Sequence, residues 1–386
     1  MTISDPTTTV EVFPGFDTLP ADSRAVFGGV DRLFAGPSWW KTVLDNALPE
    51  GVVARFVLIR RNGAAVALFP MQSGGPEGFG SLTTPYTCLY APLLAPSLDA
   101  PGLDAPDLVV TGLDAPDLVV TDLVAPDLVA TAERDGVFGA FGRFCRGYAV
   151  TRLDALPAEW PDLDRLIQAC TRAGLVPLRF DHFGNWYEPV TGLDWTGYLN
   201  ARPGALRETI RRRLRRAERL AEARFVLATT PRDVEDGIQA FEDIYARSWK
   251  EPEPFPRFNA ALMRATALTG TARLGLWFVG ETPVATQFWV VEQGRATVLK
   301  LAHDEAFKAH SPGTVLSAMM LRHLLDREHV TEIDYGRGDD PYKQGWAQQR
   351  RQRVGLLLAT PWRLGGMVAV LKHKAGRIRS RMRPAG

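Results

Sequence analysis

The first strong signal in the apolar pattern is a pair of β-prone runs. Residues 52–71, VVARFVLIRRNGAAVALFPM, place Asn62-Gly63 between two apolar runs. An Asn-Gly pair in that position predicts a tight β-hairpin. A further β-prone stretch, SLTTPYTCLYAPLLA, covers residues 81–95. The chain is therefore predicted to open with antiparallel β-structure.

Strand and helix patterns alternate from about Val137 onward. The predicted helices are 138–145 and 162–174, and the predicted strands are 148–156 and 175–181. Such alternation is typical of an α/β unit. The turn-rich run HFGNWYEPVTG then predicts a domain boundary near residue 190.

A ten-residue repeat precedes this alternation. LDAPDLVVTG begins at Leu103, LDAPDLVVTD at Leu113 and LVAPDLVAT at Leu123. Copies at so short a period favour an inserted loop or paired short strands at about residues 98–132. A β-solenoid is the alternative, although three proline-bearing units would make a very short one. We expect no chemistry in the repeat.

The second half predicts three helices followed by an antiparallel meander. Helix patterns cover residues 205–225, 234–250 and 259–268, and strand patterns cover 273–280, 282–293 and 296–304. A helix at 311–328 follows, with Ser311 placed to cap it and Pro312 allowed in its first turn. A last strand, TEIDYG, begins at Thr331.

The arginine array of the 205–225 helix has two interpretations. Its apolar positions lie on one side, and arginines from Arg207 to Arg224 crowd the rest. The array is either a solvated face supported by neighbouring glutamates or a contact surface for phosphates. Arg211 and Arg215 are the candidates for such a contact.

Composition and charge exclude several classes of protein. The chain has 386 residues, 46% of them hydrophobic and 23% charged, with a formal net charge of +1. This length suits two or three domains, and this charge gives no global attraction to nucleic acid or membrane. The three cysteines form no CxxC pair and the histidines lack HxH or HExxH spacing. We expect neither a disulfide framework nor a metal site.

Targeting signals are not evident in the sequence. The first residues lack the basic start and apolar core of a secretory signal, and no apolar run approaches the ~20 residues that span a bilayer. We therefore expect a cytoplasmic protein. Residues 361–386 are basic with an apolar start, which predicts a disordered tail, with a helix on a membrane surface as the alternative.

The densest set of reactive side chains is DYGRGDDPYKQGWA, residues 334–347. It starts at the end of a predicted strand and turns on glycine and proline, and loops on a rigid scaffold often carry chemistry. The start of the 311–328 helix is a second candidate site. Its unpaired N–H groups and positive dipole end can hold a pyrophosphate.

The order of these elements and four motifs resemble a known superfamily. RRRLRRAER, IYARSW, HSPGTVLSAMMLRHLL and IDYGRGDDPYKQGWA resemble the GNAT-superfamily acetyltransferase-like family that includes the cellulose-biosynthesis protein CelD. More distantly they are similar to the Fem aminoacyltransferases, which build peptidoglycan bridges. The resemblance covers about residues 195–355. It implies an α/β (α+β) fold of tandem GNAT-like domains, each a mixed, largely antiparallel sheet flanked by helices.

The implied organisation has three parts. Residues 1–190 would form an N-terminal GNAT-like domain that carries the repeat insertion. Residues 191–360 would form the C-terminal GNAT acyltransferase domain, and residues 361–386 the basic tail.

The resemblance implies acyl-CoA as a cosubstrate, with no permanently bound cofactor. The residues implied at its phosphates are Lys308, Ser311, Gly313 and Thr314. The GNAT signature at this place is Arg or Gln, two residues, Gly, one residue, then Gly or Ala. Here lysine and serine replace the first two, and Pro312 removes one N–H donor. Leu301 lies where exposed N–H groups, at 299–302, would face the oxyanion.

Acyl transfer also needs a base for the acceptor and an acid for the leaving thiolate. Asp334, Asp339 and Asp340 are candidates to take a proton or orient the acceptor. The resemblance implies that Tyr342 protonates the thiolate and that Lys343 matches a Fem-like lysine facing negative charge. Alternatively, Lys343 is a surface lysine paired with Asp339 or Asp340.

An indole outside this loop is a further candidate for the acceptor site. Trp249, which follows Arg247 in IYARSW, can wall an acceptor pocket or simply pack against its neighbours.

Three functions remain open at this point. The leading hypothesis is an N- or O-acyltransferase that moves an acyl group such as acetyl from acyl-CoA to a small molecule or a glycan precursor of the envelope. The second takes aminoacyl-tRNA as donor, on the strength of Lys343 and the arginine array. The third is a non-catalytic GNAT-fold subunit of a polysaccharide assembly, because the phosphate signature is weak.

Overall fold

The computed structural model of the protein describes residues 8–28, 32–75, 78–98, 126–220 and 222–381. Most of the ten-residue repeat, residues 99–125, lies outside these ranges. The prediction of a loop or strands up to residue 132 is wrong at its end, because the helix α2 begins at Pro126. Proline is compatible with the first turn of a helix, so the third copy of the repeat can open one.

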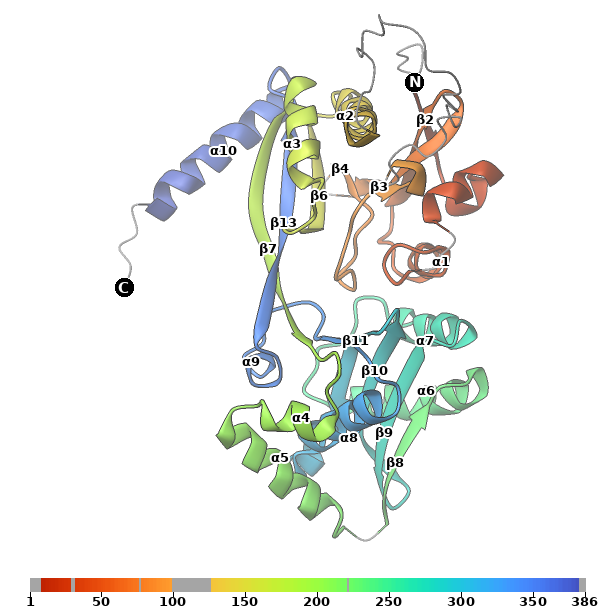
Figure 1. The fold of residues 1–386 in the computed structure, drawn as a ribbon, viewed down its shortest axis with the longest axis vertical. Coiled ribbons are helices and arrows are strands. Elements are labelled where there is room, and N and C mark those ends of the chain that lie inside the picture. Colours follow the sequence, from red (N-terminus) through yellow and green to blue (C-terminus); the bar gives the residue numbers. More distant parts are fainter. Residues whose placement is uncertain (1–7, 29–31, 76–77, 99–125, 221, 382–386) are drawn as a thin grey trace, which may run out of the picture.

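A sheet of 13 strands runs the length of the molecule (Figure 1). Its order is β1-β2-β3-β4-β6-β13-β7-β12-β11-β10-β9-β8, with β5 paired to β3 beside this path. The strands are β1 (Thr8–Phe13), β2 (Val53–Arg61), β3 (Ala64–Gly75), β4 (Gly78–Ser81), β5 (Leu93–Leu94), β6 (Val150–Pro157), β7 (Val176–Pro189), β8 (Ala223–Ala228), β9 (Ala272–Val279), β10 (Thr282–Glu292), β11 (Arg295–His303), β12 (Glu332–Asp334) and β13 (Gln349–Ala359).

Two pairs of neighbouring strands, β4/β6 and β11/β12, are parallel. The other pairs between the described strands are antiparallel. Each half of the molecule therefore contains antiparallel strands that lead into one parallel pair. The predicted mixed, largely antiparallel sheet is confirmed.

Ten α-helices are described around this sheet. They are α1 (Pro37–Asn46), α2 (Pro126–Cys145), α3 (Leu163–Arg172), α4 (Trp195–Asn200), α5 (Gly204–Ala217), α6 (Pro231–Ala246), α7 (Phe258–Leu268), α8 (Pro312–Asp326), α9 (Lys343–Trp346) and α10 (Leu364–Arg381). In the second half, α6 and α7 share a core with Leu276, whereas α4, α5 and α8 share another with Trp277. Neighbouring residues of a strand face opposite sides, so helices cover both faces of this sheet.

The predicted hairpin and meander are confirmed. Asn62 and Gly63 turn between β2 and β3 with φ of 48° and 83°, the conformation that an Asn-Gly hairpin favours. The strands β9, β10 and β11 pair in sequence. The predicted 205–225 helix is too long, since α5 ends at Ala217 and residues from Ala223 form β8. Pairing of β8 with β9 overrides the helical pattern there.

Two long strands join the halves (Figure 1). The strand β13, which follows the second half in sequence, lies between β6 and β7 of the first. The strand β7 in turn pairs with β12 of the second half. The helices α1 and α7 also meet, with the rings of Trp39 and Phe258 5.7 Å apart. The two halves therefore share both a sheet and an apolar contact.

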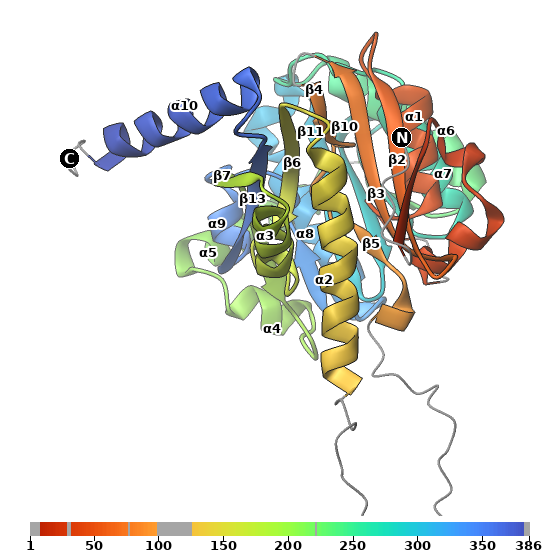
Figure 2. The ribbon, with the colours of Figure 1, turned by 90° about the horizontal axis from the view of Figure 1, so that it is seen from above.

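The C-terminal segment differs from its prediction. The disordered tail expected over 361–386 is wrong for residues 364–381, which form α10. Figures 1 and 2 both show this helix leaving the body of the molecule.

Candidate active site

The parallel pair of the second half separates after a short contact. β11 and β12 pair only from Arg295–Thr297 to Glu332–Asp334. Beyond this point β11 continues along β10, whereas the other chain turns away at Gly336, whose φ is 64°. A Cβ at Gly336 would lie 2.6 Å from the Val298 carbonyl oxygen, so only glycine fits this turn.

A cavity of about 240 Å³ occupies the gap between the separated strands. Val298 and Leu301 of β11 form one wall, and Tyr335 and Lys343 form another. Tyr86 closes it from the first half of the chain. The cavity is therefore built by both halves, and the predicted residues Leu301, Asp340, Tyr342 and Lys343 line it.

The backbone of β11 has an irregularity at this cavity. Its register with β10 moves from Lys300 to Val298, which leaves Leu299 as the extra residue of a β-bulge. A bulge leaves the extra residue's backbone groups without ladder partners. The bulge lies at the start of the 299–302 region that was predicted to face an oxyanion.

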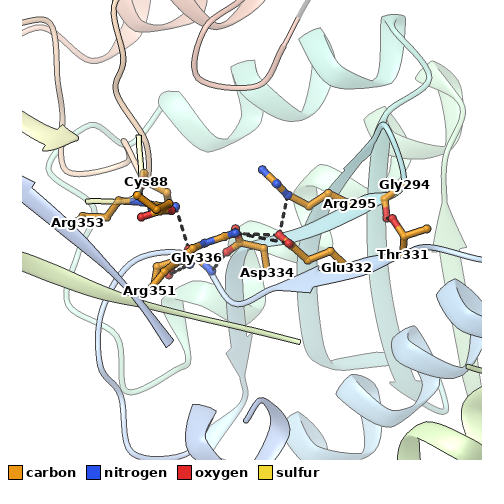
Figure 3. A network of polar contacts seen from close by, with 11 residues as sticks. Cys88, Gly294, Arg295, Thr331, Glu332, Asp334, Gly336, Arg351 and Arg353 are labelled. Carbon is orange, nitrogen blue, oxygen red and sulfur yellow. Dashed lines mark hydrogen bonds and ion pairs between the residues drawn. The ribbon is translucent and has the colours of Figure 1, made fainter. Parts of the chain in front are cut away.

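A buried polar network holds the turn that follows β12 (Figure 3). Asp334 accepts hydrogen bonds from Asn185 Nδ2 at 2.7 Å and from the Gly336 N–H at 2.8 Å. Arg351 of β13 lies 2.5 Å from its other oxygen. Both carboxylate oxygens are therefore occupied, and the network favours a structural role for Asp334 over that of a base.

Lys343 is buried, at 3% exposed, and its ammonium is surrounded by oxygens of its own loop. It donates to the carbonyl oxygens of Arg337 at 2.6 Å and Gly338 at 3.2 Å. Asp340 pairs with it at 3.0 Å. These three acceptors match its three N–H donors, so in this conformation Lys343 positions the loop. It is paired with Asp340, as the alternative interpretation expected, but it is not at the surface.

The two neighbouring aspartates of this loop point to different environments. Asp339 binds Arg350 through both oxygens, at 2.6 and 2.9 Å. It also accepts from Trp186 Nε1 and the Gly184 N–H. The Arg350 guanidinium holds the pKa of Asp339 below its usual value. Asp339 does not line the cavity, whereas Asp340 does.

Tyr342 lines the cavity and is 44% exposed. Burial of the phenol and the nearby Asp340 carboxylate raise its pKa well above the usual value. The hydroxyl therefore stays protonated across the physiological range. Cys88 also lines the cavity, but burial raises the pKa of its thiol to about 11, which argues against a nucleophilic thiolate.

Three cations at the cavity were missed by the sequence analysis. They are Lys250, Lys300 and Arg337. Lys300 pairs with Glu253 and lies 4.7 Å from the centre of the Tyr86 ring. Burial lowers the pKa of Lys250, and Lys300 and Lys343 act in the same direction. A lysine within the apolar strand VLKLA was a signal that could have identified Lys300.

The start of α8 differs from its prediction. Ser311 stands at the N-cap with φ of 53° and ψ of 52°, and its side chain makes no capping hydrogen bond. It ends the preceding 3-10 turn, Glu305–His310, which explains its left-handed backbone. Lys308 is exposed and pairs with Glu305 at 3.2 Å. Gly313 leaves space, since an added Cβ would meet only His303, at 3.5 Å. Thr314 follows it in the first turn of α8.

The other predicted substrate residues lie away from the cavity. Trp249 packs against His303, with ring centres 4.3 Å apart, and does not line the cavity. Arg211 binds Glu208 and Asn200, and Arg215 is exposed on the same helix. Arg213, which was not predicted, donates to the Ala309 carbonyl at 3.3 Å. This arginine connects α5 to the turn before α8.

A second cavity, of about 480 Å³, lies beside β4 and β6 in the first half. It meets the first cavity at Pro85 and Arg337, which line both. Its polar residues include Ser81, Arg152, Asp154 and His182. Sequence reasoning missed this site because its residues are separated by about a hundred positions.

The polar groups of this second cavity form one cluster. Arg152 Nε donates to Asp154 at 2.7 Å, and the Ala155 N–H donates to His182 Nδ1 at 3.0 Å. Ala155 holds this geometry with φ of 58°, which is rare for a residue other than glycine. Burial lowers the pKa of His182, and its other ring nitrogen, Nε2, is directed to Arg337. This ring nitrogen lies 3.5 Å from Arg337 Nη2.

Comparison with known families agrees with this geometry. Residues 204–344 match the family model of the acetyltransferase (GNAT) domain. This part of the chain, which supplies β11, α8 and the loop that carries Lys343, is therefore similar to GNAT acetyltransferase domains.

Solved structures extend the likeness to most of the chain. FemX is similar at 10% identity over 91% of this chain and 98% of that chain, with a TM-score of 0.54. A conserved protein of unknown function from Bacteroides thetaiotaomicron VPI-5482 is similar at 8% identity over 83% and 89%, with a TM-score of 0.50. At such identities the likeness shows the fold alone, and it extends over both halves of the chain.

A tandem GNAT protein from the clavulanic acid biosynthesis pathway aligns at 11% identity over 91% of this chain and 98% of that chain, with a TM-score of 0.46. A search of curated proteins finds no match.

Proposed function

We propose that the protein is an N- or O-acyltransferase that moves an acyl group, acetyl in the simplest case, from acyl-CoA to an amine or hydroxyl. The observation that carries this proposal is the cavity where β11 and β12 separate, lined by Asp340, Tyr342 and Lys343. The resemblance to the family that includes CelD supports a glycan or envelope precursor as acceptor. The free cysteines support the cytoplasm as its compartment.

The donor is proposed to lie along β11, with its phosphates toward the start of α8. The bulge at Leu299 offers free backbone groups to the thioester carbonyl. Gly313 leaves room for a ligand at the helix start, and the first N–H groups and dipole of this helix favour an anion. Pro312 removes one donor from that set, so Lys308 and Arg213 are proposed to supply the remaining attraction.

The acceptor is proposed to enter from the second cavity, past Arg337. Arg152 and Arg337 give this cavity two guanidinium groups against the single carboxylate of Asp154. An acceptor with a phosphate or carboxylate would be held there while its nucleophile reaches Asp340. Charge-assisted hydrogen bonds of this kind are the stronger ones in proteins.

The reaction then needs two proton transfers at the first cavity. The acceptor nitrogen or oxygen bonds to the thioester carbon, and its proton passes to Asp340. The C–S bond breaks, and the Tyr342 hydroxyl gives its proton to the leaving thiolate. Lys343 positions the loop that carries both groups.

The first test is the thermal stability of the protein titrated with coenzyme A and acetyl-CoA. A ligand that binds only the folded protein raises stability by about RT ln(1 + [L]/Kd). We expect a saturable rise in Tm that is lost in Gly313→Trp. Gly15→Trp is the matched control, because a side chain added at Gly15 meets nothing within 4 Å. A folded wild-type protein whose Tm responds to no thioester would refute the donor assignment.

One observation favours a second candidate, transfer from an aminoacyl-tRNA. Arg212, Arg215 and Arg216 are exposed on α5 and have no ion-pair partner among the described residues. A row of free guanidinium groups fits a phosphate backbone, and binding to it would fall steeply with salt. Activity that survives ribonuclease and rising salt would remove this candidate.

A further inference from the structure

The helix α10 is held to the body only near its start. A Cβ at Gly366 would lie 2.1 Å from the Thr360 carbonyl oxygen and 2.7 Å from that of Ala149, so the backbones are in close contact there. Beyond this turn the helix extends away from the sheet in both views (Figures 1 and 2). Most of α10 is therefore open to contact with something outside the described structure.

The first two turns of α10 carry an exposed apolar stripe. Four apolar side chains at spacings of three and four residues are between 38% and 75% exposed: Leu364, Met367, Val368 and Leu371. This spacing places them on one side of a helix. Trp362, two residues before the helix, is exposed as well, with the Arg146 guanidinium 5.0 Å from its ring centre. In a helix that remained in water, nothing would offset the cost of exposing this stripe.

Charge is distributed unevenly between this segment and the rest of the chain. After Thr360 the sequence has no Asp or Glu and seven basic residues: Arg363, Lys372, Lys374, Arg377, Arg379, Arg381 and Arg383. The remaining residues hold 38 Lys and Arg against 44 Asp and Glu, a formal charge of −6. The small net charge of the whole chain therefore hides a strongly basic end.

We propose that α10 is an interfacial helix that binds the surface of an anionic lipid bilayer. The apolar stripe would enter the boundary between headgroups and acyl chains, and the cations beside it would meet lipid phosphates. The structure has no helix that could span a bilayer among its described residues. In this proposal the helix lies on the membrane surface.

Two other partners fit these observations less well. A nucleic acid would attract the cations but would leave the apolar stripe exposed. A second copy of α10 would cover the stripe but would bring two basic segments together, which is unfavourable. An anionic bilayer complements both the charge and the apolar side chains.

The test is co-sedimentation of the full chain with vesicles of phosphatidylcholine, alone or mixed with phosphatidylglycerol. We expect binding to the mixed vesicles, weakened by salt. Lys372→Gln with Lys374→Gln should reduce the affinity about 30-fold, since each cation near the surface contributes about a factor of five. Met367→Ser with Leu371→Ser should reduce it at least as strongly. The control is Leu268→Ser, because Leu268 is 77% exposed on α7 and should not affect binding.

Circular dichroism and Tm would show that each variant is folded. Absence of wild-type binding would overturn the proposal, and so would equal binding to neutral vesicles. Binding that survives the two serine substitutions but is displaced by RNA would point to a nucleic acid. A dimer in solution that the same substitutions dissociate would point to a second copy. None of these readouts depends on acyl transfer.

Discussion

The two halves of the molecule each have an opening between parallel strands, and the two openings differ in the segments that follow their strands. In each half a parallel strand pair, β4/β6 or β11/β12, separates beside a cavity. In the second half residues 304–311 connect the strand to the start of α8. In the first half residues 82–125 separate β4 from α2. Among the described residues, the second opening is therefore the one whose strand leads into a helix start within a few residues, as the proposed donor site requires.

The two openings also differ in how their aspartates are held. Both oxygens of Asp334 are bound, by Asn185, Gly336 and Arg351. In contrast, Asp154 Oδ1 has no hydrogen-bond partner among the described residues, although it is buried. The second opening is therefore internally complete, whereas the first retains an unused acceptor. This difference fits a rigid catalytic cavity beside one that accepts a partner.

The largest expected effect tests this contrast in rigidity. Asp334→Ala leaves Arg351 partly unpaired inside the protein, and breaking a buried ion pair costs about 3–5 kcal/mol. Asp154→Ala should cost only about 1–2 kcal/mol, because fewer hydrogen bonds are lost. Urea unfolding of both variants measures the two losses. Equal losses would show that the openings are equally constrained.

The second effect tests which opening carries the chemistry. Tyr342→Phe and Asp340→Asn should each lower kcat about 100-fold, the usual contribution of a positioned acid or base. The Tm of Tyr342→Phe should not change, because its hydroxyl has no described hydrogen bond in the structure. Steady-state kinetics with acetyl-CoA and a panel of amine and sugar acceptors measures kcat. An unchanged kcat in both variants would move the chemistry elsewhere.

A smaller effect is expected at the junction of the two cavities. Arg337→Gln removes a cation that lines both. The KM of an anionic acceptor should rise about tenfold, the weight of one charge-assisted hydrogen bond. The Tm shift with acetyl-CoA should be retained. Loss of the acetyl-CoA response instead would place Arg337 in the donor site and remove the distinction between the cavities.

The smallest effect concerns Asp339, a residue of the 334–347 loop that does not line the cavity, and it depends on pH. Asp339→Asn should cost about 1 kcal/mol near pH 7, because the Arg350 pair is partly exposed. Arg350 lowers the pKa of Asp339 in the folded protein, so this contribution is complete above about pH 4 and fades as the pH falls further. The difference in unfolding free energy between the wild type and Asp339→Asn, measured from pH 7 to pH 3, tests this expectation. If this difference in unfolding free energy stayed constant with pH, the Asp339 carboxylate would be excluded as the source of the stabilisation.

The candidate site was partly predictable from the sequence. The composition of residues 334–347 identifies the loop, and a strand that ends in a polar turn predicts its place at the sheet edge. The roles within it were not predictable. Asp339 and Asp340 are adjacent, and their directions depend on the turn at Gly338, with φ of 99°, and on Arg350 in a different strand.

The part of the site that was not predicted is built from residues that are distant from one another in the sequence. Lys250, Lys300 and Tyr86 have no common motif, and only folding brings them to one cavity. Likewise, Ala155 and His182 meet through a strand irregularity that no local pattern predicts. Local periodicity predicted the hairpin and the meander well, because these pair neighbouring segments. The β13 insertion was not predictable in this way, since β13 pairs with β6 across about two hundred residues.

The position of β13 has a consequence for how the protein is made. Among the described strands, β13 fills the slot between β6 and β7, and it begins at Gln349, long after β7 ends at Pro189. During synthesis the first half must therefore wait, with two strand edges unpaired, until β13 has left the ribosome. Unpaired edges are prone to aggregate. The nascent protein is thus expected to depend on chaperones, and a chain truncated before Gln349 should be insoluble even though it retains every residue of the cavity walls.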